Sequence, residues 1–192
     1  MLIDFPYNKE RAVTYARQWA LSRNPLFIDF TGRGGDCTSF VSQSVFAGSG
    51  IMDFTPTYGW YYKSSADRSP SWSGVDEFFN FTTGVPEFSN ANNGTGPVGF
   101  DITDGRDIDI GDVIQLANSN GEFYHSLLIS GFTDNDILVC AHSDDALDRP
   151  ISTYNYASLR VIHIDRVVLE LDTEASFENI LNAREISFAT VV

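Results

Sequence analysis

The order of the secondary-structure signals along the chain most restricts its fold, because helical patterns come first and strand patterns come last. Residues 8–22 and 37–47 carry apolar side chains at helical spacing. After Gly111 the pattern changes to β-branched and aromatic runs separated by polar turns, at residues 113–117, 123–130, 136–143 and 159–171. Helices followed by strands indicate an α+β protein in which N-terminal helices pack on one face of an antiparallel sheet.

Both predicted helices have recognisable boundaries. Asn8 is a good N-cap for the first helix, and Asn24-Pro25 lies beyond its end. The second helix follows a glycine-rich turn, TGRGGD at residues 31–36, and begins at Cys37. Gly48 and Gly50 mark its end, since glycine commonly terminates a helix.

The length of 192 residues suits a single domain. We expect residues 1–168 to form this domain and residues 169–192 to be a C-terminal extension, whose structure the sequence leaves open. Residues 82–99 are rich in Asn, Gly and Pro, which predicts a long loop. A hydrophobic content of 43%, with 14% aromatic residues, is enough for a packed core and excludes intrinsic disorder.

The charge balance excludes two classes of partner. The chain has 26 acidic and 12 basic residues, for a formal net charge of −14 at pH 7. Nucleic acids and anionic membranes both attract basic surfaces, so we expect neither as a partner. No apolar run approaches the ~20 residues that span a bilayer. Residues 1–13 lack the pattern of a signal peptide, and the two cysteines are too few for a disulfide framework.

Cys37 is the most informative residue for chemistry. It follows two glycines and begins a predicted helix. The N–H groups and partial positive charge at a helix N-terminus stabilise a thiolate and can also bind the oxyanion that forms on an attacked carbonyl. The glycines allow a substrate backbone to approach closely. The alternative is a small buried residue without a chemical role, because cysteine is often buried.

A cysteine nucleophile normally needs a histidine as its base, and the chain has three histidines. His125 lies on a predicted central strand, and a helix-borne cysteine facing a strand-borne histidine is the arrangement of papain-like sites. His142 lies on the next predicted strand and could orient His125 across the strand pair. His163 alternates with isoleucines, which predicts the solvent face of a strand. A purely structural histidine is the alternative for His125.

Three weaker signals concern ligands. Residues 101–112 are acidic, but Arg106 stands where a calcium loop needs glycine. A zinc site would have to use Cys37, His125, Cys140 and His142, but the chain has no CxxC pair, which is typical of such sites. We therefore expect no metal and no cofactor. Trp60 and Tyr61 either line a cleft for a peptide or sugar, or belong to the core.

Several segments together resemble a known family. GGDCTSFVSQSVFAGSG at residues 34–50 resembles the nucleophile motif of the putative amidase domain family. That family is a bacterial branch of the papain-like superfamily, related to NlpC-type cell-wall peptidases and CHAP amidases. Similar segments cover residues 7–165 in order: YNKERAVTYARQWA, GWYY, GDVIQL, YHSLLIS and AHSDD.

The resemblance implies a papain-like fold and an activity: hydrolysis of amide bonds, through a thioester, in peptides of the cell-wall type. It implies Cys37 as the nucleophile and His125 as the general base. His142 matches the orienting third residue of NlpC-type relatives, and Asp144 is the alternative because a carboxylate orients imidazole well.

The resemblance also implies that two residues beside Cys37, Asp36 and Thr38, contact the substrate. It suggests the cell envelope or secretion, although the residues themselves leave localisation open. A monomer is expected. Two other functions stay open: a non-catalytic binding module on the same fold, and an acyltransferase that uses the same thiol.

Overall fold

The structure is a computed structural model and describes residues 1–85, 94–171 and 181–182. The helices are α1 (Lys9–Trp19), α2 (Cys37–Ser49), α3 (Pro70–Ser73), α4 (Val75–Thr83) and the 3₁₀ turn η1 (Ile151–Thr153). The strands are β1 (Leu2–Pro6), β2 (Gly96–Asp101), β3 (Val113–Ala117), β4 (Phe123–Phe132), β5 (Ile137–Ala141), β6 (Ala146–Pro150) and β7 (Ser158–Glu170). The predicted α+β class is confirmed.

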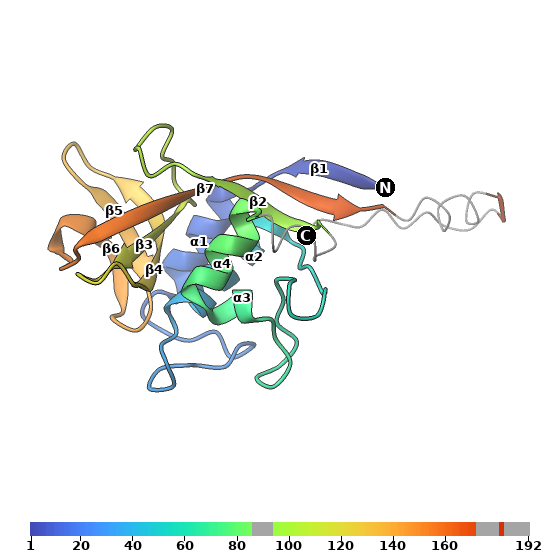
Figure 1. Cartoon of the computed structure of the whole chain (residues 1–192), viewed down its shortest axis with the longest axis horizontal. Coiled ribbons are helices and arrows are strands. Elements are labelled where there is room, and N and C mark those ends of the chain that lie inside the picture. The colour runs from blue at the N-terminus through green and yellow to red at the C-terminus, as the bar shows by residue number, and fades with distance from the viewer. Residues whose placement is uncertain (86–93, 172–180, 183–192) are drawn as a thin grey trace.

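Within the described residues the strands form one antiparallel sheet in the order β1-β7-β3-β4-β5-β6, and β2 pairs with β7 as well. The long strand β7 therefore joins three partners, and β1 and β2 run beside it in Figure 1. The sheet brings Leu116 of β3 opposite His125 of β4, near the centre of the strand order.

Three strands had no strand signal in the sequence. β1 is mostly exposed, so it lacks the apolar alternation of a half-buried strand. β6 is a short edge strand that ends in Pro150, and proline is typical of such edges. β2 begins with Gly-Pro inside the predicted loop at residues 82–99, and α4 reaches Thr83, so the loop prediction is wrong for 82–83 and 96–99. Residues 86–93 of that predicted loop lie outside the described residues.

The helices pack on one face of the sheet, as predicted (Figure 1). Apolar residues of α1, α2 and α4 meet sheet residues that include Val113, Leu128 and Ile162. The other face carries a second apolar cluster, covered by η1 and the residues after it. Alternate residues of β3 and β4 thus enter different clusters, which explains why these strands are apolar almost throughout.

Both predicted helix starts agree with the structure. The Asn8 side chain accepts a hydrogen bond from the Arg11 N–H at 3.0 Å, as an N-cap does. Helix α1 ends at Trp19 rather than Ser22, because the chain tightens into a turn in which Ser22 N–H donates to the Trp19 carbonyl. Helix α2 begins at Cys37 and ends at Ser49; Gly48 lies inside it, and Gly50, with a φ of 73°, is its C-cap.

One contact fixes the start of α2 against the sheet. The hydroxyls of Thr38 and Ser126 are 2.9 Å apart and both are buried. The Gln115 side chain holds Ser126 from the next strand, at 3.2 Å, and also donates to the Val75 carbonyl. Because Thr38 follows Cys37 and Ser126 follows His125, this contact sets the two chemically interesting residues beside each other.

Residues near the C-terminal end of the domain extend the sheet. Strand β7 continues to Glu170, past the predicted domain end at residue 168. Most of the predicted extension, residues 172–180 and 183–192, lies outside the described residues. No helix in the described ranges is both long enough and apolar enough to cross a membrane.

Candidate active site

Cys37 is the first residue of α2 and is buried, at 6% exposure. The glycines before it have φ angles of 101° at Gly34 and 104° at Gly35, in the left-handed region that favours glycine. They bring the chain around to the helix start without placing a side chain over the thiol. The Asp36 side chain makes no capping bond to the helix, so it leaves the first N–H groups of α2 available.

The Asp36 carboxylate points into the protein. One oxygen accepts from the Phe30 N–H at 3.1 Å, and the other lies 2.7 Å from His142 Nδ1. His142 Nε2 lies 2.9 Å from the Trp19 carbonyl oxygen, which can only accept, so this nitrogen donates. Asp36 and His142 are each 1% exposed. This buried pair ties the loop before Cys37 to the end of β5 and to α1.

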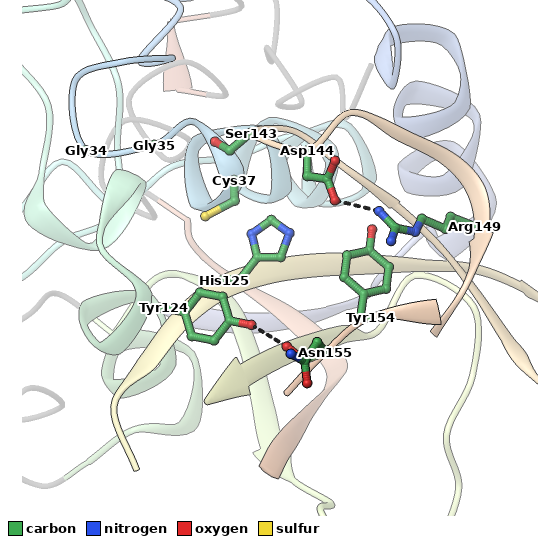
Figure 2. Close-up of a pocket in the computed structure, with 10 residues that line it drawn as sticks. All are labelled: Gly34, Gly35, Cys37, Tyr124, His125, Ser143, Asp144, Arg149, Tyr154 and Asn155. Atoms are coloured by element: carbon green, nitrogen blue, oxygen red, sulfur yellow. Dashed lines mark hydrogen bonds and ion pairs between the residues drawn. The ribbon is translucent and has the colours of Figure 1, made fainter. Parts of the chain in front are cut away.

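A pocket of about 350 Å³ opens in front of Cys37 (Figure 2). Its lining comes from the glycine turn, the start of α2, β4, the β5–β6 turn, β6 and the residues after η1: Gly34, Gly35, Cys37, Tyr124, His125, Ser143, Asp144, Arg149, Tyr154 and Asn155. Figure 2 shows the Cys37 thiol and the His125 ring side by side at one end of this pocket.

His125 is set up as a neutral base. Its ring is 7% exposed, and burial lowers its pKa to about 4, although the Asp144 carboxylate nearby favours the charged form. The imidazole is therefore uncharged at neutral pH and can accept a proton. Its Nε2 atom is buried and has no hydrogen-bond partner among the described residues.

Asp144 and Arg149 form an ion pair at the pocket wall. The Arg149 Nη1 to Asp144 Oδ2 distance is 2.5 Å, and the guanidinium lies 4.0 Å from the centre of the Tyr154 ring. Asp144 is two-thirds exposed, with a side-chain exposure of 67%. Its charge acts on His125 through space, where it raises the pKa that burial lowers.

The structure brings together some of the predicted site residues and separates others. Cys37, His125 and Asp144 line one pocket. His142 does not reach His125, because both of its ring nitrogens are bonded to other groups. Asp36 is also held away from the pocket, by His142 and Phe30.

The remaining predicted substrate contacts are internal. Thr38 is fully buried against Ser126. Trp60 is fully buried, and its indole N–H donates to the Ser42 hydroxyl at 3.0 Å. Tyr61 is also buried and packs beside Phe54. None of the three lines the pocket in front of Cys37, so the structure favours the alternative in which these aromatics belong to the core.

His163 is partly exposed between buried Ile162 and Ile164, as the alternation predicted, but it also has a buried partner. Its Nδ1 atom lies 3.0 and 3.1 Å from the two carboxylate oxygens of Asp112, which is buried. The alternation along β7 gave the right periodicity but could not show this partner on a neighbouring segment. Cys140 is fully buried, and its sulfur lies 4.0 Å from the Asp148 carboxylate. Within the described ranges, no three His, Cys, Asp or Glu side chains gather as metal ligands would.

Sequence reasoning missed Arg149, Tyr154 and Asn155 in the pocket. They lie on and after β6, the edge strand that carried no strand signal. The available clue was the acidic pair after His142, because a turn rich in Asp often has a nearby basic partner. That clue indicates a basic partner but does not single out Arg149, since Asp145 of the same turn pairs with Arg23 instead.

The model of a family described as putative amidase domain matches residues 6–164, which is most of the chain. The match covers the glycine turn, α2, β4 and the β5–β6 turn, so it includes every group that lines the pocket. No curated protein and no solved structure matches the chain. The chain belongs to the putative amidase domain family, whose description indicates an enzyme that hydrolyses amides.

Proposed function

We propose that this protein is a cysteine amidase or peptidase of papain-like type. The Cys37 thiol gives its proton to His125, and the thiolate sulfur attacks the carbonyl carbon of the amide. His125 returns the proton to the leaving amine, and the C–N bond breaks to leave a thioester. Water, deprotonated by His125, then releases the acid and restores the thiol.

One observation carries this proposal: a cysteine at a helix N-terminus shares a pocket with a buried, neutral histidine in a chain of an amidase family. The helix start supplies N–H donors for the oxyanion on the attacked carbonyl. The glycine turn leaves room for the substrate chain above the sulfur, since a Cβ added at Gly34 would meet nothing within 4 Å.

We propose Asp144 as the carboxylate that favours the imidazolium form of His125. It lines the same pocket, and its charge stabilises a positive ring. His142 has no free nitrogen for this task, so its role in the proposal is to hold Asp36 and thereby the loop that leads into Cys37.

The proposed substrate is a peptide amide of the cell-wall type, such as a peptidoglycan stem peptide. Support comes from the resemblance of residues 34–50 to the nucleophile motif of the putative amidase domain family, which is related to NlpC-type cell-wall peptidases. A helix-borne cysteine facing a histidine on an antiparallel sheet is also the papain-like arrangement. The pocket of about 350 Å³ has the size of a site for a short peptide segment.

The test is turnover on a panel of stem peptides and simple peptide amides, with Cys37→Ala and Cys140→Ala as a matched pair. Both variants remove one buried thiol, but only Cys37 lines the pocket. We expect Cys37→Ala to lose hydrolysis and Cys140→Ala to keep it. Full turnover by Cys37→Ala would refute the proposal. An amine acceptor added to the assay separates a hydrolase from an acyltransferase, because only the latter yields a new amide.

A further inference from the structure

Two buried polar atoms at the pocket have no hydrogen-bond partner among the described residues: His125 Nε2 and the Tyr154 hydroxyl. Their rings lie 6.0 Å apart, centre to centre, at 42° to each other. Figure 2 shows one nitrogen of the His125 ring on the Cys37 side and the other on the Tyr154 side. Unpaired buried polar groups are uncommon and costly, so two in one pocket point to a function.

The Tyr154 ring is held in place from behind. The Arg149 guanidinium packs 4.0 Å from its centre and donates to the Thr153 hydroxyl at 2.8 Å, to the Thr153 carbonyl at 3.2 Å and to Asp144 at 2.5 Å. In Figure 2 the hydroxyl lies next to the Asp144–Arg149 pair, across from His125. Burial raises the Tyr154 pKa to about 12, so the hydroxyl keeps its proton and can both donate and accept.

A second tyrosine on the other side of His125 gives a contrast. The Tyr124 ring lies nearly parallel to the imidazole, with centres 6.2 Å apart. Its hydroxyl, however, donates to the Asn155 carbonyl at 3.1 Å. Of the two tyrosines that flank His125, Tyr154 is the one whose hydroxyl makes no hydrogen bond of normal geometry to a described residue, although the nearby Arg149 guanidinium lowers its pKa against the larger effect of burial.

In the proposed reaction His125 becomes a cation, and the Tyr154 hydroxyl can accept a hydrogen bond from it. The nitrogen that faces Cys37 takes the thiol proton, so the remote nitrogen carries hydrogen before and after the transfer, and its N–H becomes a stronger donor once the ring is charged. We propose that Tyr154 is a positioning residue for His125, whose hydroxyl oxygen accepts from that N–H while its hydrogen points to Asp144. This inference rests on the proposed function. The positive charge of the imidazolium supplies the driving force for a bond that the free enzyme does not make.

The titratable and charged groups around His125 come from five places in the fold, while β3 places the apolar Leu116 opposite it. They are Cys37 from α2, Tyr124 from β4 itself, Asp144 from the β5–β6 turn, Arg149 from β6 and Tyr154 after η1. Asp144 favours the imidazolium and Arg149 opposes it. A hydroxyl between the ring and Asp144 would couple the carboxylate to the ring without direct contact.

The test measures the rate at which iodoacetamide modifies Cys37 as a function of pH, by mass spectrometry of the intact enzyme. This assay needs no substrate and reports the formation of the thiolate–imidazolium pair. Tyr154→Phe removes one hydroxyl from the pocket, and Tyr156→Phe removes one from the same segment outside the pocket lining. His125→Gln removes the base.

We expect Tyr154→Phe to move the midpoint of the Cys37 profile up by about one pH unit, because the imidazolium loses a hydrogen bond. It should lower kcat about tenfold with little change in KM. Tyr156→Phe should follow the wild type in both assays. A Tyr154→Phe profile equal to that of Tyr156→Phe, together with a shifted His125→Gln profile, would overturn the inference and leave the Cys37–His125 pair standing. An unshifted His125→Gln profile would overturn both.

A second variant guards against a general disturbance of the pocket. If Tyr154 connects Asp144 to His125, Asp144→Asn should shift the Cys37 profile less in the Tyr154→Phe background than in the wild type. Equal shifts in the two backgrounds would contradict the connection. The melting temperatures of all variants are measured as well. Tyr154→Phe should have the melting temperature of the wild type, because the lost hydroxyl makes no hydrogen bond of normal geometry to a described residue in the free enzyme.

Discussion

Replacing His142 by alanine should lower the free energy of unfolding strongly, while the molecules that stay folded keep most of their turnover. The His142 ring is buried and both of its nitrogens are bonded, at 2.7 Å to Asp36 and at 2.9 Å to the Trp19 carbonyl. It also stacks on Phe40, with ring centres 4.0 Å apart. The substitution leaves the Asp36 carboxyl group buried without its main partner.

The size of the loss follows from these contacts. Removing one partner of a buried pair typically costs about 3–5 kcal/mol. Arg23 Nε lies 3.5 Å from the Asp36 carboxylate and keeps a positive charge nearby, which puts our expectation near the lower end of that range. A domain of ordinary stability has about 5–15 kcal/mol in total. The variant should therefore lose a large fraction of its free energy of unfolding.

Urea unfolding followed by tryptophan fluorescence measures this loss, with Asp144→Asn as the contrast. The Asp144 side chain is 67% exposed, so its loss should change the free energy of unfolding by less than about 1 kcal/mol. Its turnover should nevertheless fall about tenfold, because His125 loses a charge that favours its protonated form. A His142→Ala protein of wild-type stability whose turnover falls a hundredfold would refute the reasoning and make His142 the residue that orients His125.

Three further outcomes are expected. His163→Ala should lower the free energy of unfolding by about 1–3 kcal/mol, measured in urea, because buried Asp112 loses a hydrogen-bond partner; an unchanged midpoint would contradict this. The pKa of His125 is lowered from 6.5 to about 4 on folding, so the unfolded chain binds the extra proton between these values. Stability should fall as pH drops from about 6.5 to 4, by up to about 3 kcal/mol, and this part of the pH dependence should be absent in His125→Gln. Burial raises the pKa of the Cys140 thiol, so iodoacetamide should modify Cys37 first in the native protein and Cys140 only on unfolding; faster modification of Cys140 would reverse our assignment of the reactive thiol.

The predictable parts of the fold are those whose signals are local. The starts of α1 and α2 follow from an N-cap and a glycine turn, and the strands β3, β4, β5 and β7 follow from their β-branched and aromatic composition. The strands β1, β2 and β6 form because a neighbouring strand offers hydrogen bonds along its edge. The residues of these three strands carry no strand pattern of their own. Their existence depends on tertiary contacts, and a pattern read along the chain does not contain those contacts.

The same distinction applies to the site. Cys37 could be singled out because its helix and its glycines are adjacent in the chain. The partners of His125 depend on a reversal of direction at the end of β5. In a continued strand His142 and Asp144, two residues apart, would point to the same face. Ser143 between them has a φ of 72°, and its hydroxyl accepts from the Asp36 N–H at 2.6 Å.

That turn sends the two candidate third residues to different places. His142 enters the core to hold Asp36, whereas Asp144 reaches the pocket beside His125. Strand alternation cannot predict this outcome, because a single left-handed residue breaks the period on which alternation rests. The loop before Cys37 and the turn after β5 are bonded to each other twice, through Ser143 and through His142. The segments of the nucleophile and of the carboxylate that acts on its base are therefore joined by two contacts, and the Ser143 bond still joins the two segments when His142 is replaced.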